Sequence, residues 1–218
     1  MMAEDRYDRG RTTGLLVGRR SPVEHRRPRG GRDDMPGFRR ALAALGGVHP
    51  RARLAERSAA YLRGELPAED YVVLARYVPR DDSDEEVSMV VVGPHGVLVV
   101  EPRDDEGDLV CYQDHWYRRT PLGDSHALHD SPSNRARWNA ARVKSDLASG
   151  GFIYTAVEGV VVLTRGRPDD VRSSCVPVCV GLDELVGQLM LHEPSAGATA
   201  EHTRALVEAL AKPIRLMA

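Results

Sequence analysis

An acidic and a basic side chain stand two residues apart where a valine-rich segment ends. Glu101 directly follows the run Val97–Val100, and Arg103 comes two residues later. A carboxylate is the kind of ligand that Mg²⁺ prefers in proteins. An arginine stays protonated under ordinary conditions, so it can bind a phosphate oxygen but cannot act as a general base. These residue types at one strand end suit the binding of phosphate, with or without a metal ion.

The clearest element that positions this pair is a β-hairpin. Two valine-rich runs, 87–92 and 97–100, are separated by the sequence GPHG, whose residue types favour a turn. Further strands are expected at 71–78, 109–112, 115–118, 156–164 and 176–180, helices at 51–65, 133–147, 183–191 and 198–211, and a loop at 120–131. This order predicts an α/β fold with a central mixed sheet and helices against its faces.

The first 48 residues differ in composition from the rest of the chain. The 218 residues have a net charge of −2, but residues 1–48 carry eleven arginines against six acids, or +5, which leaves −7 for the remainder. This Arg/Gly/Pro-rich segment has no sustained apolar period, so we expect a disordered leader with one short helix at 36–47. The remainder is predicted to form one domain at 49–192, with residues 193–218 as a C-terminal helix packed on it.

Two features of the composition limit where the protein acts. No run of roughly 18 or more apolar residues exists, so the sequence predicts no membrane span. The three cysteines, Cys111, Cys175 and Cys179, show neither a CxxC motif nor a zinc spacing, which favours a reducing, cytoplasmic compartment. Cys175 and Cys179 are expected to be small buried apolar residues, and Trp116 and Trp138 are expected to be packing residues.

The hairpin and the helix after it resemble the nuclease-related domain (NERD) family, a branch of the PD-(D/E)XK restriction-endonuclease-like superfamily. The resemblance covers about residues 50–165 and rests mainly on EEVSMVVVGPHGVLVVEPRDDEGDL (85–109) and SPSNRARWNAARVKSDL (131–147). The matching positions are Gly93, Pro94 and Gly96 in the turn, Val97–Val100 in the second strand, Glu101 as the acid of an E-x-K motif, and Gly107. The resemblance implies a restriction-endonuclease-like fold and metal-dependent cleavage of DNA.

Three positions depart from the family pattern. Ser88 stands where the family carries a metal-binding Asp, Arg103 where it carries the lysine of E-x-K, and Arg135 where it carries a Gln. The serine removes a negative charge from the expected metal site, so the affinity for a metal should fall. If activity survives, the resemblance implies that Glu101 holds Mg²⁺ or Mn²⁺ and that Arg103 stabilises the scissile phosphate. If activity is lost, no cofactor is expected.

A second acid would have to complete such a metal site. Glu86 lies two residues before Ser88, so on an extended strand both side chains point to one face about 7 Å apart. Glu56 stands where members of the family carry a helical Glu. The sequence HALHD (126–130) lies in the predicted loop, so it implies no ligand geometry for zinc. Glu86 and Glu56 are therefore the candidates to join Glu101.

Arginines come from several segments that surround the site in the resembled fold. The candidate nucleic-acid-binding residues are Arg103, Arg118, Arg135 and Arg142, whose guanidinium groups suit phosphate oxygens. Acidic residues at 104–108 lie in the same region, so no strong positive field follows. We expect a protein that binds nucleic acid, namely DNA, and cuts it weakly or not at all. The alternative is a non-catalytic protein-interaction or regulatory module on the same scaffold, and the oligomeric state is left open.

Overall fold

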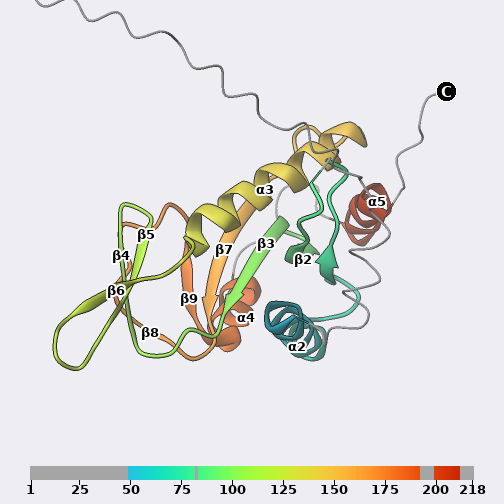
Figure 1. The fold of residues 1–218 in the computed structure, drawn as a ribbon. Helices are drawn as coiled ribbons and strands as arrows, with labels where there is room; N and C mark the ends of the chain where they lie inside the picture. The colour runs from blue at the N-terminus through green and yellow to red at the C-terminus, as the bar shows by residue number, and fades with distance from the viewer. Residues whose placement is uncertain (1–48, 82, 192–198, 212–218) are drawn as a thin grey trace, which may run out of the picture.

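The computed structural model describes residues 49–81, 83–191 and 199–211 (Figure 1). Its helices are α2 (Pro50–Glu65), α3 (Pro132–Ser149), α4 (Gly181–Leu191) and α5 (Ala200–Ala211). Its strands are β1 (Val72–Tyr77), β2 (Val87–Gly93), β3 (Gly96–Arg103), β4 (Asp108–Tyr112), β5 (His115–Arg119), β6 (Ser125–Ala127), β7 (Val157–Leu163), β8 (Arg167–Asp170) and β9 (Val178–Val180). The helices and strands predicted within these ranges are present, with ends that differ by a few residues.

Some predictions concern parts of the chain outside these ranges. The predicted leader, 1–48, and its helix at 36–47 lie outside the described residues, as do 193–198 and 212–218 of the predicted C-terminal segment. Among the described helices, none combines the length and the hydropathy that a membrane span needs. The cytoplasmic location stays a prediction.

The strands form two mixed sheets. The larger has the order β1-β2-β3-β7-β9, in which β1, β2 and β3 are antiparallel neighbours and β7 and β9 run parallel to β3. This sheet confirms the predicted central mixed sheet. The smaller sheet has the order β6-β5-β4-β8 and was not predicted as a separate layer. Its strand β6 lies in the predicted loop, and β8 (RPDD) was not predicted, because neither segment has the apolar or β-branched residues that mark a strand.

The predicted hairpin is β2 and β3, and it forms the centre of the larger sheet. All seven residues of β2 are buried. Gly93 pairs with Gly96 at the turn, and Gly96 has a φ of +109°, which a glycine adopts without strain. A Cβ on Gly93 would lie 2.4 Å from two ring atoms of Tyr71, so the absence of a side chain there lets the aromatic ring cover the turn.

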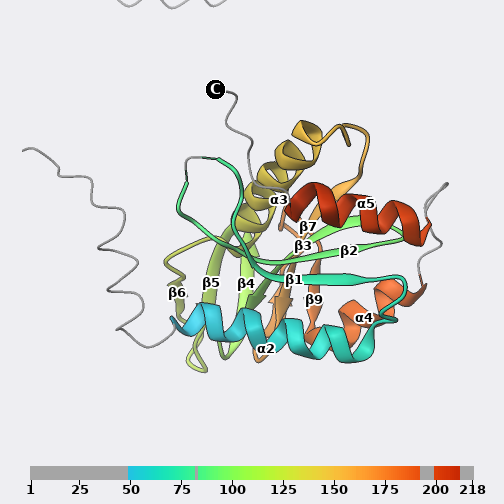
Figure 2. The same ribbon diagram turned by 90° about the vertical axis from the view of Figure 1, so that its right-hand side faces the viewer.

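The larger sheet is covered on both faces. Helices α2 and α4 lie on one face, whereas α3 and α5 lie on the other (Figure 2). Successive residues of a strand point to opposite faces of the sheet. Met89 and Val91 of β2 pack with Leu62 of α2, whereas Val90 and Val92 pack on the opposite face. The second cluster includes Val143 and Leu147 of α3 and Leu206 and Leu210 of α5. Burial of both faces explains why β2 is apolar except at Ser88 instead of alternating.

The smaller sheet fixes the amino end of α3. Leu109 and Trp116 pack with Ala136 of α3 and with Val161 of β7. The indole nitrogen of Trp116 donates a hydrogen bond to Ser133 Oγ at 2.9 Å. The first turn of α3 is thereby held against both sheets.

Two of the four predicted packing residues are not buried. Trp116 and Cys179 are buried, as predicted, with 2% and 0% of their surface exposed. Trp138 is 67% exposed, because the packed face of α3 is formed by other residues, among them Ala140 and Val143. Cys175 is exposed because it lies in the segment before β9, not in the strand. The predicted burial of Cys175 and the predicted packing role of Trp138 were therefore wrong.

The close contact between α3 and β7 gives a stability prediction. A Cβ on Gly159 of β7 would lie 2.7 Å from the carbonyl carbon and oxygen of Ala136, and backbone atoms cannot yield as a flexible side chain can. We expect Gly159→Ala to lower the free energy of unfolding by about 1–3 kcal/mol, as overpacking of a core does. The measurement is urea denaturation followed by circular dichroism.

The matched control for this variant is Gly187→Ala in α4. A Cβ on Gly187 meets nothing within 4 Å, so alanine should stabilise the helix by up to about 1 kcal/mol. Equal effects of the two substitutions would contradict the close approach of α3 to β7.

Candidate functional site

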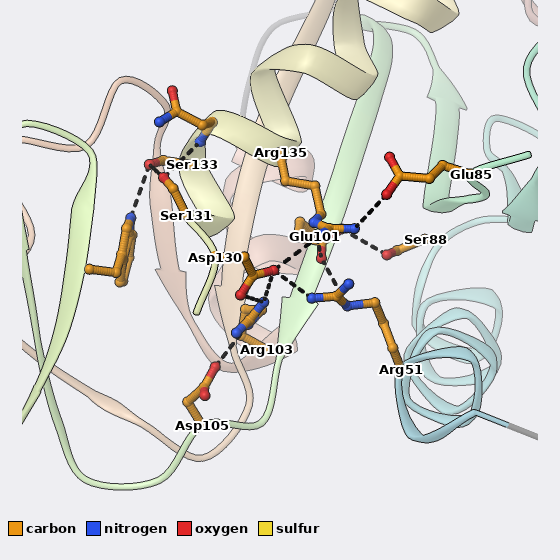
Figure 3. Close-up of polar contacts among 12 residues, drawn as sticks. Arg51, Glu85, Ser88, Glu101, Arg103, Asp105, Asp130, Ser131, Ser133 and Arg135 are labelled. Atoms are coloured by element: carbon orange, nitrogen blue, oxygen red, sulfur yellow. Dashed lines mark hydrogen bonds and ion pairs between the residues drawn. The ribbon is translucent and has the colours of Figure 1, made fainter. Parts of the chain in front are cut away.

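The central residue of the candidate site is Glu101, which is only 1% exposed. The register that pairs Met89 with Val100 places Ser88 of β2 opposite Glu101 of β3. Ser88 Oγ donates a hydrogen bond to Glu101 Oε2 at 2.7 Å (Figure 3). The serine that replaces the expected acid is thus a hydrogen-bond donor to the remaining one.

Two arginines from two helices face the other oxygen of Glu101. Arg51, in the first turn of α2, has its Nε 3.7 Å from Glu101 Oε1, and Arg135, in the first turn of α3, has its Nε 4.0 Å away. Within the described residues Oε1 is buried and makes no hydrogen bond. Its negative charge is therefore balanced by two long ion pairs, at 3.7 and 4.0 Å, and not by hydrogen bonds.

Asp130 joins these arginines to Arg103. Its carboxylate lies 2.6 Å from an Arg51 nitrogen, 3.0 Å from an Arg103 nitrogen and 3.3 Å from an Arg135 nitrogen. Figure 3 shows the three guanidinium groups pointing toward Asp130 and Glu101 from α2, β3 and α3. We call Arg51, Arg103 and Arg135, with Glu101 and Asp130 between them, the arginine cluster.

The cluster continues toward the smaller sheet through a second acid. Arg103 Nε lies 2.8 Å from Asp105, and Arg118 of β5 lies 3.4 Å from the same carboxylate. The Arg103 side chain is 11% exposed, whereas that of Arg118 is 46% exposed. Arg103 thus donates its hydrogen bonds to Asp105 and Asp130. Arg118 lies at the more exposed end of this chain of ion pairs.

The pKa values in the cluster follow from burial and charge. Burial raises the pKa of Glu101, and the Ser88 hydrogen bond and the charges of Arg51, Arg135 and Arg103 oppose this shift without cancelling it. Burial also acts to raise the pKa of Asp130, but the hydrogen bonds and charges of Arg103 and Arg51 outweigh it and hold that pKa below its usual value. Asp130 is the firmly ionised acid of the pair.

The donor set of this site does not fit Mg²⁺ or Mn²⁺. Such ions take carboxylate oxygens together with water and substrate oxygens. Here one oxygen of Glu101 accepts a hydrogen bond from Ser88, and the other faces two guanidinium groups that would repel a cation. Over the three described ranges, no group of three or more His, Cys, Asp or Glu side chains converges in a way that could hold a metal ion.

The other predicted site residues make separate contacts. Both oxygens of Glu86 bond to Arg76 of β1, at 2.8 and 2.9 Å, and Glu56 is exposed on α2. Arg142 is buried on α3, where its guanidinium bonds to the Asp81 carboxylate, to Asn139 and to the carbonyl of Glu85. The structure therefore brings together Glu101, Arg103 and Arg135, links Arg118 to them through Asp105, and does not bring Glu86, Glu56 or Arg142 into these ion pairs.

Two members of the cluster, Arg51 and Asp130, were not predicted. A basic residue in the first turn of a helix opposes the helix dipole, so Arg51 directly after Pro50 is a signal that an acidic partner lies nearby. Asp130 comes just before Ser131, whose side chain caps α3, and that position favours an anion. Neither signal identifies the partner, because the two segments lie 79 residues apart in the sequence.

The raised pKa of Glu101 predicts an unusual pH dependence of stability. A carboxyl whose pKa is raised by folding contributes most below its unfolded pKa, near 4.3, and the contribution is lost as the pH rises through the folded pKa. Glu101→Gln imitates the neutral carboxyl, so the wild type should lose unfolding free energy relative to this variant as the pH rises from about 4 to 7. Urea denaturation across this pH range measures the difference.

The control for this experiment is Glu106→Gln, which removes an exposed carboxylate that, among the described residues, pairs only with Arg165. That variant should follow the wild type in parallel at every pH. The opposite trend would be a wild type that gains unfolding free energy relative to Glu101→Gln as the pH rises. It would mean that the charges of the three arginines lower the pKa of Glu101 more than burial raises it.

A comparison with known protein families now adds to this geometry. Residues 51–164, more than half of the chain, match the family model of the nuclease-related domain (NERD). No curated protein and no solved structure gives a significant match. The matched segment begins at Arg51 and contains the hairpin, Glu101 and the start of α3, so the resemblance predicted from the sequence is confirmed. The chain belongs to the nuclease-related domain family.

Proposed function

We propose that this domain binds DNA through the arginine cluster and has weak or no metal-dependent phosphodiesterase activity. The observation that carries the proposal is the state of Arg135. Within the described part of the chain, its guanidinium lies 3.3 to 4.0 Å from three carboxylates, and none of these contacts is a hydrogen bond. The group is held in place while its donors remain available to a ligand.

Phosphate is the ligand chemistry that this arrangement suits. Arginine donors match phosphate oxygens in pairs, and such charge-assisted hydrogen bonds are roughly twice as strong as neutral ones. The side chains of Arg51 and Arg135 are 34% and 26% exposed, so an anion can reach them. Both arginines lie in the first turn of a helix, where the backbone dipole also favours an anion.

Cleavage requires more than phosphate binding. A metal-bound water needs carboxylates to hold the metal, and Glu101 stands beside Ser88 and two guanidinium groups instead. Arg103 cannot serve as a general base, and it is already bonded to Asp105 and Asp130. These contacts best support a protein that binds phosphate groups of DNA and has lost the cleavage reaction.

The first test is DNA binding by fluorescence anisotropy, with labelled single- and double-stranded DNA at several salt concentrations. The affinity of the wild type should fall linearly with salt on a logarithmic scale, with a slope set by the phosphates contacted. Arg135→Ala should weaken binding about tenfold, because hydrogen bonds to a charged group contribute about 1.5–3 kcal/mol.

The matched control for binding is Arg172→Ala. Arg172 is 89% exposed and, within the part of the chain that the structure describes, pairs only with Asp170 of β8, so the variant loses the same charge outside the cluster. Equal weakening by both substitutions would indicate a diffuse charge effect. Indifference of the wild type to DNA at every salt concentration would favour the alternative, a protein-interaction or regulatory module.

The second test is cleavage of labelled DNA with Mg²⁺ or Mn²⁺ by the wild type and by Glu101→Ala. We expect no cutting above background by either protein. Metal-dependent cutting by the wild type that disappears in the variant would contradict the loss of activity, and it would mean that another acid completes a metal site with Glu101.

A further inference from the structure

A groove runs beside α3, and its lining residues do not include members of the arginine cluster. Its volume is about 820 Å³. One wall is a stripe of α3 that includes Trp138, Arg142, Ser145 and Ser149, and the other wall includes Ala205 and Glu208 of α5. The spacings of four, three and four residues place these α3 side chains on one face of the helix.

The indole ring of Trp138 is exposed on the wall of this groove. It is 67% exposed, whereas Trp116, the other tryptophan of the chain, is 2% exposed and hydrogen-bonded to Ser133. An indole ring exposed to this extent adds little to the core. Its large flat face is available to a ligand in the groove.

The groove and the arginine cluster are continuous along one helix face. Arg135 precedes Trp138 by three residues, so it extends the stripe by one turn toward the amino end of α3. Three residues of α-helix rise about 4.5 Å. A phosphate at Arg135 and a group stacked on Trp138 are thus within the reach of one nucleotide and its neighbour.

The charges of the groove favour a base over the phosphate backbone. Asp81, Asp146 and Glu208 line it together with Arg80 and Arg142. The acids outnumber the arginines, and Arg142 already pairs with Asp81, so the groove offers little attraction for a phosphate. A nucleobase is neutral and carries both hydrogen-bond donors and acceptors. Only an unpaired base offers its flat face to an aromatic ring, because the faces of bases in a duplex are already stacked on their neighbours.

We propose that the groove binds an unpaired nucleobase, stacked on Trp138, of a single DNA strand whose phosphate lies at the arginine cluster. This inference rests on the proposed function and adds its substrate class. Trp138 is then a specificity residue that selects single-stranded over double-stranded DNA.

The test uses the full chain with two probes, a short oligothymidylate and a duplex of mixed sequence. Oligothymidylate should quench the intrinsic fluorescence, and Trp138→Phe should remove most of the quenching, because the only other tryptophan is buried. Trp138→Ala should weaken oligothymidylate binding about tenfold and leave duplex binding unchanged, since stacking on an aromatic ring contributes about this much per base.

The matched control is Tyr154→Ala, which removes a 95% exposed aromatic ring that does not line the groove. Its affinity for both probes should equal that of the wild type. If Trp138→Ala binds oligothymidylate as tightly as the wild type while Arg135→Ala binds it weakly, the stacking inference is overturned and the proposed function stands. If the wild type binds neither probe, the proposed function itself fails.

Discussion

The structure around the site depends on one buried charge. Glu101 is 1% exposed, and an isolated ionised carboxylate in such a place costs several kcal/mol of solvation. Ser88 satisfies one of its oxygens, and the other is balanced by Arg51 and Arg135, which arrive from two different helices. The amino ends of α2 and α3 must therefore lie against the same end of β3. In turn, the contact of Trp116 with Ser133 holds the start of α3 in that position.

This dependence changes how the departures from the family pattern are understood. A second carboxylate at position 88 would place two negative charges side by side, an arrangement suited to a cation. A serine there, with arginines at 103 and 135, makes an arrangement suited to an anion. Relative to the family pattern expected from the sequence, Ser88 removes a negative charge and Arg135 adds a positive one, whereas Arg103 keeps the positive charge of a lysine. The charges at the three positions together are a better guide to the site than any one of them.

The sequence predicted most of the larger sheet and its helices, because valine-rich strands and amphipathic helices carry their own periodicity. It did not predict β6 or β8, whose residues are mostly polar and which pair with β5 and β4. Within the site, Glu101, Arg103 and Arg135 were predicted because they stand at polar positions of the resembled family pattern. Arg51 and Asp130 were missed because their contact joins segments 79 residues apart. The contacts of Arg142 with Asp81 likewise depend on tertiary structure. Its arginine type and its place in a segment near the site of the resembled fold had suggested a role in binding nucleic acid.

Asp130 has a consequence for any anion that enters the cluster. Its carboxylate lies within 3.3 Å of a nitrogen of each of the three guanidinium groups, so a phosphate that binds beside them comes close to a negative charge. In the free protein it keeps the arginines from repelling one another and fixes their geometry in advance. A ligand phosphate must compete with this internal anion, and the loss of its contacts subtracts from the binding free energy. The same side chain thus preorganises the site and limits its affinity, which favours ligands that are exchanged rapidly over ligands that are retained.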